Sequence, residues 1–159
     1  MPPASRPPTH DIASVASARY DIFANYWPKV TDPTNAIASA LNSQPKYVVS
    51  RSLDRVAWNN AGLIKSDVVA ELRKLRQQPG QTLQTWGSTE LLQTLLQCDL
   101  IDEYRLFIFP VVLGCGKRLF GSGTVPAALR QVASVASGKG ATYHRFERCG
   151  TPQYGRMGT

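Results

Sequence analysis

The sequence predicts an α/β fold: a mixed, mostly parallel sheet with helices on both faces and a C-terminal antiparallel hairpin. Short apolar runs, such as residues 46–50 and 103–109, alternate with segments whose apolar residues recur every three or four positions. Strands joined through helices are expected to be parallel, with right-handed crossovers. Near the end of the chain, Gly-Lys-Gly separates two strand-like segments and predicts a hairpin that adds antiparallel strands to one edge of the sheet.

The first elements follow a proline-rich start. Residues 1–10 contain four prolines and little that could be buried, so we expect a disordered tail, followed by a single domain over residues 11–159. From Asp11 to Trp27 the apolar spacing is mostly helical, and Pro28 ends it. The small residues between Ala13 and Ala18 leave a short strand there as the alternative.

The middle of the chain predicts two helices and two strands. Asp32 as N-cap and Pro33 at the first helical position begin a helix through "TNAIASALN". The β-branched run 46–50 predicts a buried strand, and 62–65 a second one. Ser66 is expected to cap the next helix, "DVVAELRKLRQQ". Its apolar face is formed by Val68, Val69, Leu72 and Leu75.

The second half begins with an abrupt junction, "TLQTWGSTELLQTLLQ", which predicts a strand at 82–86 and a helix at 89–97. Further strands are expected at 103–109, 128–137 and 141–148. The inward face of the helix is formed by Leu91, Leu92, Leu95 and Leu96.

Composition narrows the class of protein. The 159 residues carry a net charge of +7, with a pI near 9.6, which favours anionic partners. The longest apolar run, 106–113, is far shorter than the roughly 20 residues of a membrane span. The first residues contain no apolar leader, and the three cysteines form no C-x-x-C pair. We therefore expect a cytoplasmic protein that does not bind a membrane.

The junction at residues 86–90 is the first candidate site. Gly87 lets the backbone turn sharply, and the amides of Ser88, Thr89 and Glu90 would face an anion at the positive end of the helix dipole. The alternative is a plain turn in which Ser88 caps the helix and Glu90 meets the dipole. The residues alone favour that alternative.

Two further segments could contact an anion. Ser50, Arg51 and Ser52 follow a predicted strand, and the Arg51 guanidinium could hold a phosphate through two hydrogen bonds. The glycine-rich stretch 110–123 matches neither a phosphate loop nor a dinucleotide fingerprint. As a flexible loop with Lys117 and Arg118 it could still touch a ligand. A solvated turn and a solvated loop are the alternatives for these two segments.

Other chemistries lack support in the sequence. His10 and His144 lie far apart, which argues against a metal cluster or a histidine-based triad. Cys115 lies between two glycines, but no histidine is near it in sequence to activate it. The basic charge suggests nucleic acid, yet no stacking platform accompanies it, so this partner is not expected. With no evident acid or base, an enzyme built on this chain would rely on a cofactor.

Several segments together resemble the dihydrofolate-reductase-like family, and more closely the reductase domain of the bifunctional riboflavin-biosynthesis deaminase–reductase. They include "KYVVSRSLDRVAWNNAGLIKSDVV", "WGSTELLQTLL" and "DEYRLFIFPVVLGCGKRLFGSG", within about residues 19–136. The resemblance implies an NADPH-dependent reductase acting on a heterocyclic (pyrimidine- or pterin-like) or carbonyl substrate.

The resemblance also implies ligand contacts. The turn Trp86–Glu90, which includes Gly87, Ser88 and Thr89, would hold the cofactor pyrophosphate. Ser50, Arg51 and Ser52 would lie near the adenosine ribose and its 2′-phosphate. The nicotinamide or substrate would lie near Leu113, Gly114, Gly116 and Lys117.

The sequence departs from the family pattern at its start. No Ser-Leu-Asp-Gly-type strand precedes Ala13, and residues 16–19 read Ala-Ser-Ala-Arg where the family has a Gly-Arg-x-Thr-like segment. We therefore expect an N-terminally truncated or diverged member. The alternative function is a non-catalytic dimeric scaffold. A homodimer, or residues 11–27, would cover the edge that a lost opening strand leaves.

Overall fold

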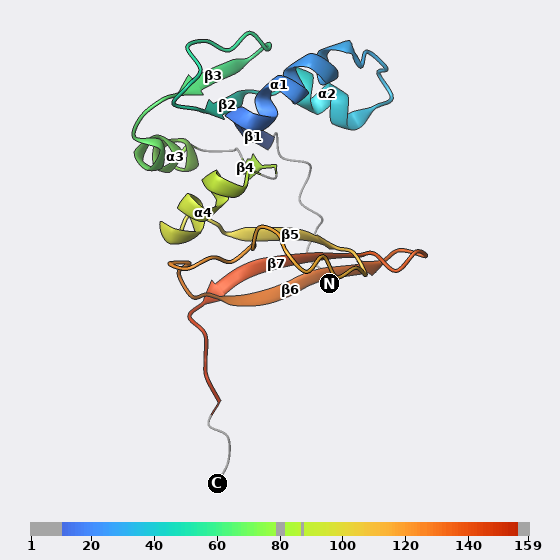
Figure 1. Cartoon of the computed structure of the whole chain (residues 1–159), viewed down its shortest axis with the longest axis vertical. Coiled ribbons are helices and arrows are strands. Elements are labelled where there is room, and N and C mark those ends of the chain that lie inside the picture. Colours follow the sequence, from blue (N-terminus) through green and yellow to red (C-terminus); the bar gives the residue numbers. More distant parts are fainter. Residues whose placement is uncertain (1–10, 79–81, 87, 156–159) are drawn as a thin grey trace, which may run out of the picture. The chain divides into compact units, whose positions relative to one another are not determined.

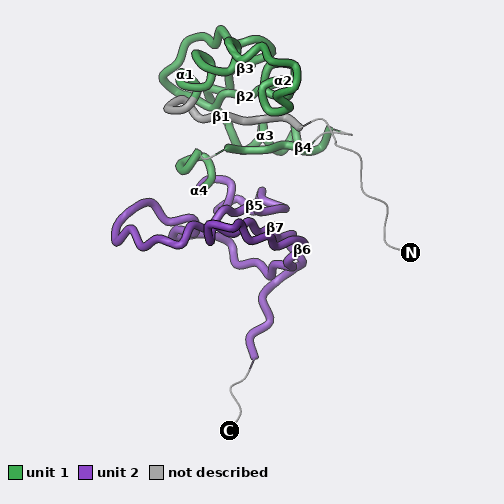
Figure 2. The backbone as a smooth tube through the Cα atoms, turned by 90° about the vertical axis from the view of Figure 1, so that its right-hand side faces the viewer, with its two compact units in different colours: residues 1–92 green, residues 93–159 purple. Residues whose placement is uncertain are grey.

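The computed structural model describes residues 11–78, 82–86 and 88–155 of the chain, and for residues 11–19 it describes the backbone only. The predicted tail, residues 1–10, lies outside these ranges. The chain forms two compact units that meet between Leu92 and Gln93 (Figure 2). Each unit is described by itself, and a single domain over residues 11–159 stays a prediction.

Unit 1 contains a four-stranded, fully parallel sheet in the order β3-β2-β1-β4. Its strands are β1 (Asp11–Ala16), β2 (Lys46–Val49), β3 (Ala61–Ile64) and β4 (Thr82–Thr85). The helix predicted from Asp11 is wrong for residues 11–16, and the alternative strand is confirmed. Ala13 pairs with Lys46 on one side and Gln84 on the other. Backbone pairing on both edges thus overrides the helical spacing of the apolar residues.

Helices cover both faces of this sheet. The helices of unit 1 are α1 (Ser17–Tyr26), the 3-10 turn η1 (Trp27–Lys29), α2 (Ala36–Ser43) and α3 (Val68–Arg76). Figures 1 and 2 show α1 and α2 on one face and α3 on the other. The predicted fold class, a parallel α/β sheet with helices on both faces, is therefore confirmed for this unit.

Two predicted helix caps are wrong. Asp32 does not begin α2, because its carboxylate accepts the backbone amide of Thr34 at 2.9 Å and closes a local turn. Asn35 is the N-cap instead, and its side chain accepts the amide of Ala38 at 3.0 Å. Helix α3 starts after Asp67, at φ +47°, and not after Ser66. Aspartate tolerates this left-handed conformation better than most residues.

The connection between β2 and β3 is an irregular loop, residues 50–60. Its backbone is tied to α1, because the Tyr20 hydroxyl accepts the amides of Ala57 at 2.7 Å and Trp58 at 2.9 Å. Trp58 packs into the core of unit 1 together with Tyr20, Leu41 and Val48. The loop therefore supplies the core contact that a crossover helix would otherwise make.

Helix α4 (Thr89–Gln97) crosses the boundary between the units, and its bounds agree with the sequence. Strand β4 ends at Thr85, one residue before the predicted end at 86. Unit 2 continues with a three-stranded antiparallel sheet in the order β5-β7-β6. Its strands are β5 (Glu103–Ile108), β6 (Ala128–Ala136) and β7 (Thr142–Gly150). The predicted hairpin is confirmed, with Ser137 and Ala141 closing its turn at 2.7 Å. It pairs with β5 in a sheet of its own and adds no strand to the parallel sheet.

Candidate functional site

The first two predicted ligand segments follow strands of the same parallel sheet. Residues 50–52 follow β2, and residues 86–90 follow β4, so both lie at the carboxyl edge. Strand β1 pairs with each of these strands and lies between them. The two segments are therefore separated by two strand spacings, roughly 10 Å.

The strand order reverses at β1. From β1 the chain proceeds to β2 and β3 on one side, whereas β4 pairs with the other side of β1. Ligands of open α/β sheets bind at such a switch point, outside the carboxyl ends of the strands. Helix α1 begins at Ser17, directly after β1, and α4 begins at Thr89 after β4. Two helix starts, whose dipoles favour anions, therefore flank the crevice between β1 and β4.

Ser88 directly precedes helix α4. Its side chain is buried, with 4% exposed, and its carbonyl accepts the amide of Leu92 at 2.8 Å. Its hydroxyl donates to the carbonyl of Trp86 at 3.4 Å. Ser88 thus takes the capping position of the plain-turn alternative, and the amides of the first turn still point away from the helix, as at any helix start. Gly87 lies outside the described residues.

Thr85, the last residue of β4, carries an orphaned polar atom. Its hydroxyl is buried and has no hydrogen-bond partner among the residues that the structure describes. A buried hydroxyl is normally satisfied, and leaving one unpaired costs roughly 1–3 kcal/mol. Next to it, Trp86 is 38% exposed. A polar ligand at this strand end would satisfy the hydroxyl, so the residues here fit a phosphate-bearing group.

Within the segment 50–52, Ser50 stabilises the turn, whereas Arg51 and Ser52 are exposed. The Ser50 hydroxyl is buried and accepts the amides of Ser52 at 3.2 Å and Leu53 at 3.1 Å. It therefore fixes the turn after β2. Arg51 and Ser52 are exposed, and within the described ranges Arg51 has no ion-pair or hydrogen-bond partner. The guanidinium is thus exposed and without a partner in the described ranges, and the turn that carries it is held in place.

The third predicted segment, residues 113–117, belongs to unit 2 and is exposed throughout. Gly114, at φ +73°, and Gly116, at φ +151°, adopt backbone conformations that favour glycine. Beyond Lys117 the loop is attached to α4, because the Gln93 side chain donates to the carbonyl of Leu119 at 2.9 Å and accepts the amide of Gly121 at 3.2 Å. The sequence did not indicate this anchor.

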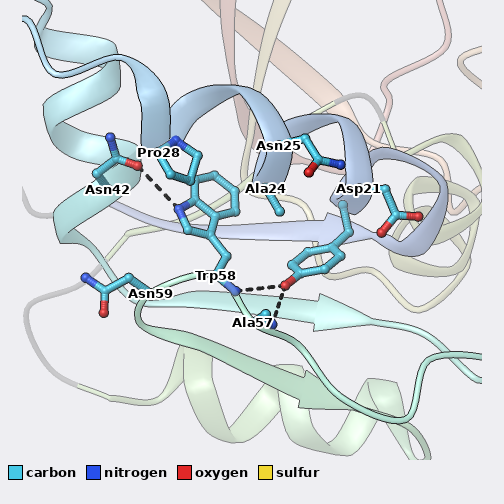
Figure 3. Close-up of a pocket in the computed structure, with 9 residues that line it drawn as sticks. Asp21, Ala24, Asn25, Pro28, Asn42, Ala57, Trp58 and Asn59 are labelled. Atoms are coloured by element: carbon cyan, nitrogen blue, oxygen red, sulfur yellow. Dashed lines mark hydrogen bonds between the residues drawn. The ribbon is translucent and has the colours of Figure 1, made fainter.

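The sequence also missed a cavity of about 640 Å³ beside α1 (Figure 3). It is bounded by α1, the end of α2 and the loop before β3. Its lining residues are Tyr20, Asp21, Ala24, Asn25, Pro28, Asn42, Ala57, Trp58 and Asn59. The one signal in the sequence is Trp-Asn-Asn at 58–60, a large aromatic residue followed by turn-forming residues.

Two classes of site find no support in the described part of the chain. No helix there has the length and apolar character of a membrane span. No three or more His, Cys, Asp or Glu side chains there form a group that could hold a metal ion.

The fold has relatives of known structure. A putative riboflavin biosynthesis protein from Shewanella sp. PV-4 superimposes with a TM-score of 0.66 at 20% identity, over 94% of this chain and 83% of that one. RibD from Acinetobacter baumannii gives 0.59 at 13% identity, over 89% and 47%. A pyrimidine reductase-like protein from Corynebacterium diphtheriae gives 0.56 at 12% identity, over 89% and 76%. These likenesses support the fold.

Sequence relatives give the family. Protein YyaP of Bacillus subtilis (strain 168), which is described as uncharacterized, is 37% identical over 103 residues, or 64% of this chain and 54% of its own length. YwjB of the same strain, also described as uncharacterized, is 30% identical over 98 residues, or 62% and 56%. The chain thus spans about half the length of these curated relatives. The family described as the RibD C-terminal domain matches residues 10–143. The predicted resemblance is confirmed, and the chain belongs to the RibD C-terminal domain family.

Proposed function

We propose that the chain is a reductase of the riboflavin-biosynthesis type that transfers a hydride from NADPH to a heterocyclic, pyrimidine- or pterin-like, or carbonyl substrate. The observation that carries this proposal is the switch point between β1 and β4, with helix starts at Ser17 and Thr89 and the unsatisfied hydroxyl of Thr85. The printed names of the structural relatives, riboflavin biosynthesis protein and pyrimidine reductase-like protein, agree with it.

Each predicted segment has a role in this proposal. The amides at the start of α4, residues 88–90, would bind the cofactor pyrophosphate, because the helix dipole favours an anion there. Arg51 would bind the 2′-phosphate that distinguishes NADPH from NADH. Trp86 and Gly87 would complete the turn around the phosphates. Leu113, Gly114, Gly116 and Lys117 would border the nicotinamide and the substrate.

The chain's own contribution is binding and orientation. Bound NADPH supplies the hydride, which none of the twenty side chains can donate. Helix α4 and the Ser50 turn hold their polar groups in fixed positions, so the cofactor is oriented without reorganising the site. Arg51 adds a charge that stays positive at any physiological pH.

Calorimetric titration with NADPH and NADH tests the cofactor site. We expect Arg51→Ala to weaken NADPH binding about tenfold or more and NADH binding little, because a charge-assisted hydrogen bond contributes roughly 1.5–3 kcal/mol. Arg55→Ala is the matched control, since Arg55 is an exposed arginine of the same loop without a partner among the described residues. Equal effects of both substitutions, or no heat and no change in Trp86 fluorescence at millimolar NADPH, would refute the site.

Turnover separates the two functions that the sequence left open. Oxidation of NADPH, followed by absorbance with pterin, pyrimidine and quinone-like acceptors, is expected for a reductase. Cofactor binding without oxidation of NADPH by any of these acceptors would favour the alternative, a non-catalytic dimeric scaffold. Assembly as a homodimer and a location in the cytoplasm stay predictions, to be checked by light scattering and by fractionation.

A further inference from the structure

The cavity beside α1 lies apart from the predicted cofactor segments. Asn59 precedes β3, and the carbonyl of the next residue, Asn60, accepts the amide of Lys46 at the start of β2. This part of the cavity is therefore at the amino edge of the sheet, whereas residues 50–52 and 86–90 are at the carboxyl edge. None of those residues lines the cavity. Its volume of about 640 Å³ falls within the usual range of roughly 300–1,000 Å³ for small-molecule sites.

The floor of the cavity is aromatic and held rigidly. Tyr20 and Trp58 are both buried in the core, and the Tyr20 hydroxyl is fixed by the two amides that it accepts. The indole nitrogen of Trp58 donates to the Asn42 side chain at 3.3 Å, and Asn42 in turn donates to the carbonyl of Trp27 at 2.9 Å. In Figure 3 a dashed line joins the indole nitrogen of Trp58 to Asn42, and Pro28 lies beside the indole ring. Although Tyr20 and Trp58 are only 5% and 6% exposed, both line the cavity, so its floor is apolar and rigid, which suits an aromatic ring.

The rim of the cavity is polar and unengaged. Asp21 and Asn25 lie one turn apart on α1, and Asn59 lies on the opposite loop. All three side chains are exposed, and none has a hydrogen-bond or ion-pair partner in the part of the chain that the structure describes. Together they offer a carboxylate acceptor and two amides that both donate and accept. A ligand with N–H donors as well as acceptors would use this set.

Charged side chains near the floor disfavour ionic ligands. Asp21 is the one ionisable acid among the lining residues and would repel a phosphate or carboxylate. Lys46 is 1% exposed, and its ammonium lies 4.7 Å from the centroid of the Trp58 ring, where it interacts with the ring's π-system. That charge disfavours a second cation near the same ring. A neutral ligand avoids both repulsions.

We propose that this cavity is a second binding site, which takes a neutral, planar heterocycle of nucleobase size through the Tyr20–Trp58 floor and the Asp21, Asn25 and Asn59 rim. The proposed site shares no residue with the cofactor segments 50–52 and 86–90, so the two can be tested separately.

Three small planar probes test the charge preference: adenine, which is neutral, benzamidine, which is a cation, and benzoate, which is an anion. In calorimetric or ligand-observed NMR titrations at pH 7.5, we expect adenine to bind at least about tenfold more tightly than the other two. A tenfold difference in affinity corresponds to about 1.4 kcal/mol. Equal affinity for all three probes, or a preference for either ion, would overturn the proposal.

Variants and amide resonances locate the bound probe. We expect Asn25→Ala and Asn59→Ala each to weaken adenine binding about three- to tenfold, the usual effect of one lost hydrogen bond. Gln78→Ala, which removes an exposed amide at the end of α3, should leave it unchanged. Adenine should shift the side-chain NH₂ resonances of Asn25 and Asn59 and the indole N–H of Trp58. Shifts at Ser88 and Glu90 with a loss of binding in Arg51→Ala would instead place adenine at the cofactor segments and overturn the second site.

Discussion

The two units differ in how they use apolar residues. Unit 1 gathers Tyr20, Leu41, Val48 and Trp58 into one buried cluster around its parallel sheet. In unit 2 the segment 107–113 is apolar throughout and exposed, and the Val112 side chain reaches 99% exposure. Both candidate sites of unit 1 therefore rest on walls fixed by packing and hydrogen bonds. The predicted substrate segment of unit 2, residues 113–117, begins within this exposed apolar stretch. The loop is anchored only after Lys117, where the Gln93 side chain forms hydrogen bonds with the backbone of Leu119 and Gly121.

This difference shows that side chains at the candidate sites of unit 1 are positioned by neighbouring residues. In unit 1 a side chain that lines the cavity is fixed by a second residue, as Asn42 fixes Trp58 through a hydrogen bond. Side chains that are locked in this way keep their geometry when a ligand binds. Contiguous exposed apolar surface such as residues 107–113 usually marks a surface that contacts something else. Substitutions in the two units should therefore differ in kind, as the following predictions state.

The largest contrast is expected for a matched pair of leucines. Leu41→Ala, at a position with 6% exposure, should lower the free energy of unfolding by about 2–5 kcal/mol, because it leaves a cavity in the core. Leu113→Ala, at 78% exposure, should change it by less than about 0.5 kcal/mol. Chemical denaturation monitored by circular dichroism measures both. A large loss for Leu113→Ala would show that this segment is packed against another surface in solution.

Because Lys46 is buried, the stability of unit 1 should depend on pH in the alkaline range. Its ammonium donates to the carbonyls of Leu41 and Gln44, both at 2.7 Å, yet burial lowers the pKa of the group to about 8. Between pH 8 and 10.5 the unfolded chain therefore binds more protons at this position than the folded chain. Stability should rise with pH across that window, by on the order of 3 kcal/mol.

The control for this rise is Lys46→Met, which removes the titrating group and keeps an unbranched side chain. The difference in unfolding free energy between the two proteins, followed from pH 7 to 10.5, isolates the contribution of Lys46, because all other ionisable groups are common to both. A difference that stays constant with pH would contradict the lowered pKa.

A smaller effect is expected for the hydroxyl that joins α1 to the β2–β3 loop. Tyr20→Phe leaves the amides of Ala57 and Trp58 without their acceptor, which should cost about 1–3 kcal/mol. Tyr26→Phe is the matched control, because the Tyr26 side chain is exposed. Hydrogen exchange should show faster exchange at residues 57 and 58 in Tyr20→Phe alone. Unchanged exchange at both amides would mean that the hydroxyl does not hold the loop.

The smallest effect concerns an ion-pair chain in unit 2. Glu103 contacts Arg105 at 2.6 Å and Arg145 at 2.9 Å on the antiparallel sheet. Burial by itself would raise the pKa of Glu103, but the hydrogen bonds and charges of the two arginines outweigh it and lower the pKa. The stabilisation is then present above the ordinary carboxyl pKa and is lost as the pH falls through the folded value.

The acid limb of the unfolding curve measures this contribution. Because the pair is partly exposed, Glu103→Gln should cost only about 0.5 kcal/mol at pH 7, and the difference from wild type should shrink as the pH falls below the ordinary carboxyl pKa. Asp54→Asn, which breaks a more exposed pair with Lys65, is the control and should change stability less. A difference between wild type and Glu103→Gln that stays constant throughout the acid limb would contradict the electrostatic origin.

Sequence patterns predicted the elements with strong local signals. The strand predicted at 82–86, the helix at 89–97 and the hairpin around Gly-Lys-Gly follow from periodicity and turn chemistry, and the structure has each of them, with the strand one residue shorter. The errors fell where the local signal was ambiguous. Residues 11–16 form a strand because they pair with β2 and β4. Asn35, and not Asp32, caps α2, because the Asp32 carboxylate accepts the amide of Thr34.

The candidate site was predictable only in part. Arg51 and the start of α4 could be found, since they follow recognisable strands. The position of Ser17 at the switch point depends on strand order, which links segments distant in sequence. The cavity depends on Tyr20 meeting the amide of Trp58, a contact across 38 positions of the chain. No local pattern encodes such contacts.

The strand order also bears on how the chain folds as it is synthesised. Strand β1 lies inside the sheet, but one of its two neighbours, β4, is the last strand of unit 1 to leave the ribosome. We therefore expect nascent chains that end before Thr82 to leave one edge of β1 unpaired. Contacts so distant in sequence form slowly, whereas the hairpin of unit 2 closes locally. Unit 2 follows unit 1 in the chain, yet its hairpin would then fold with less delay once it has been synthesised.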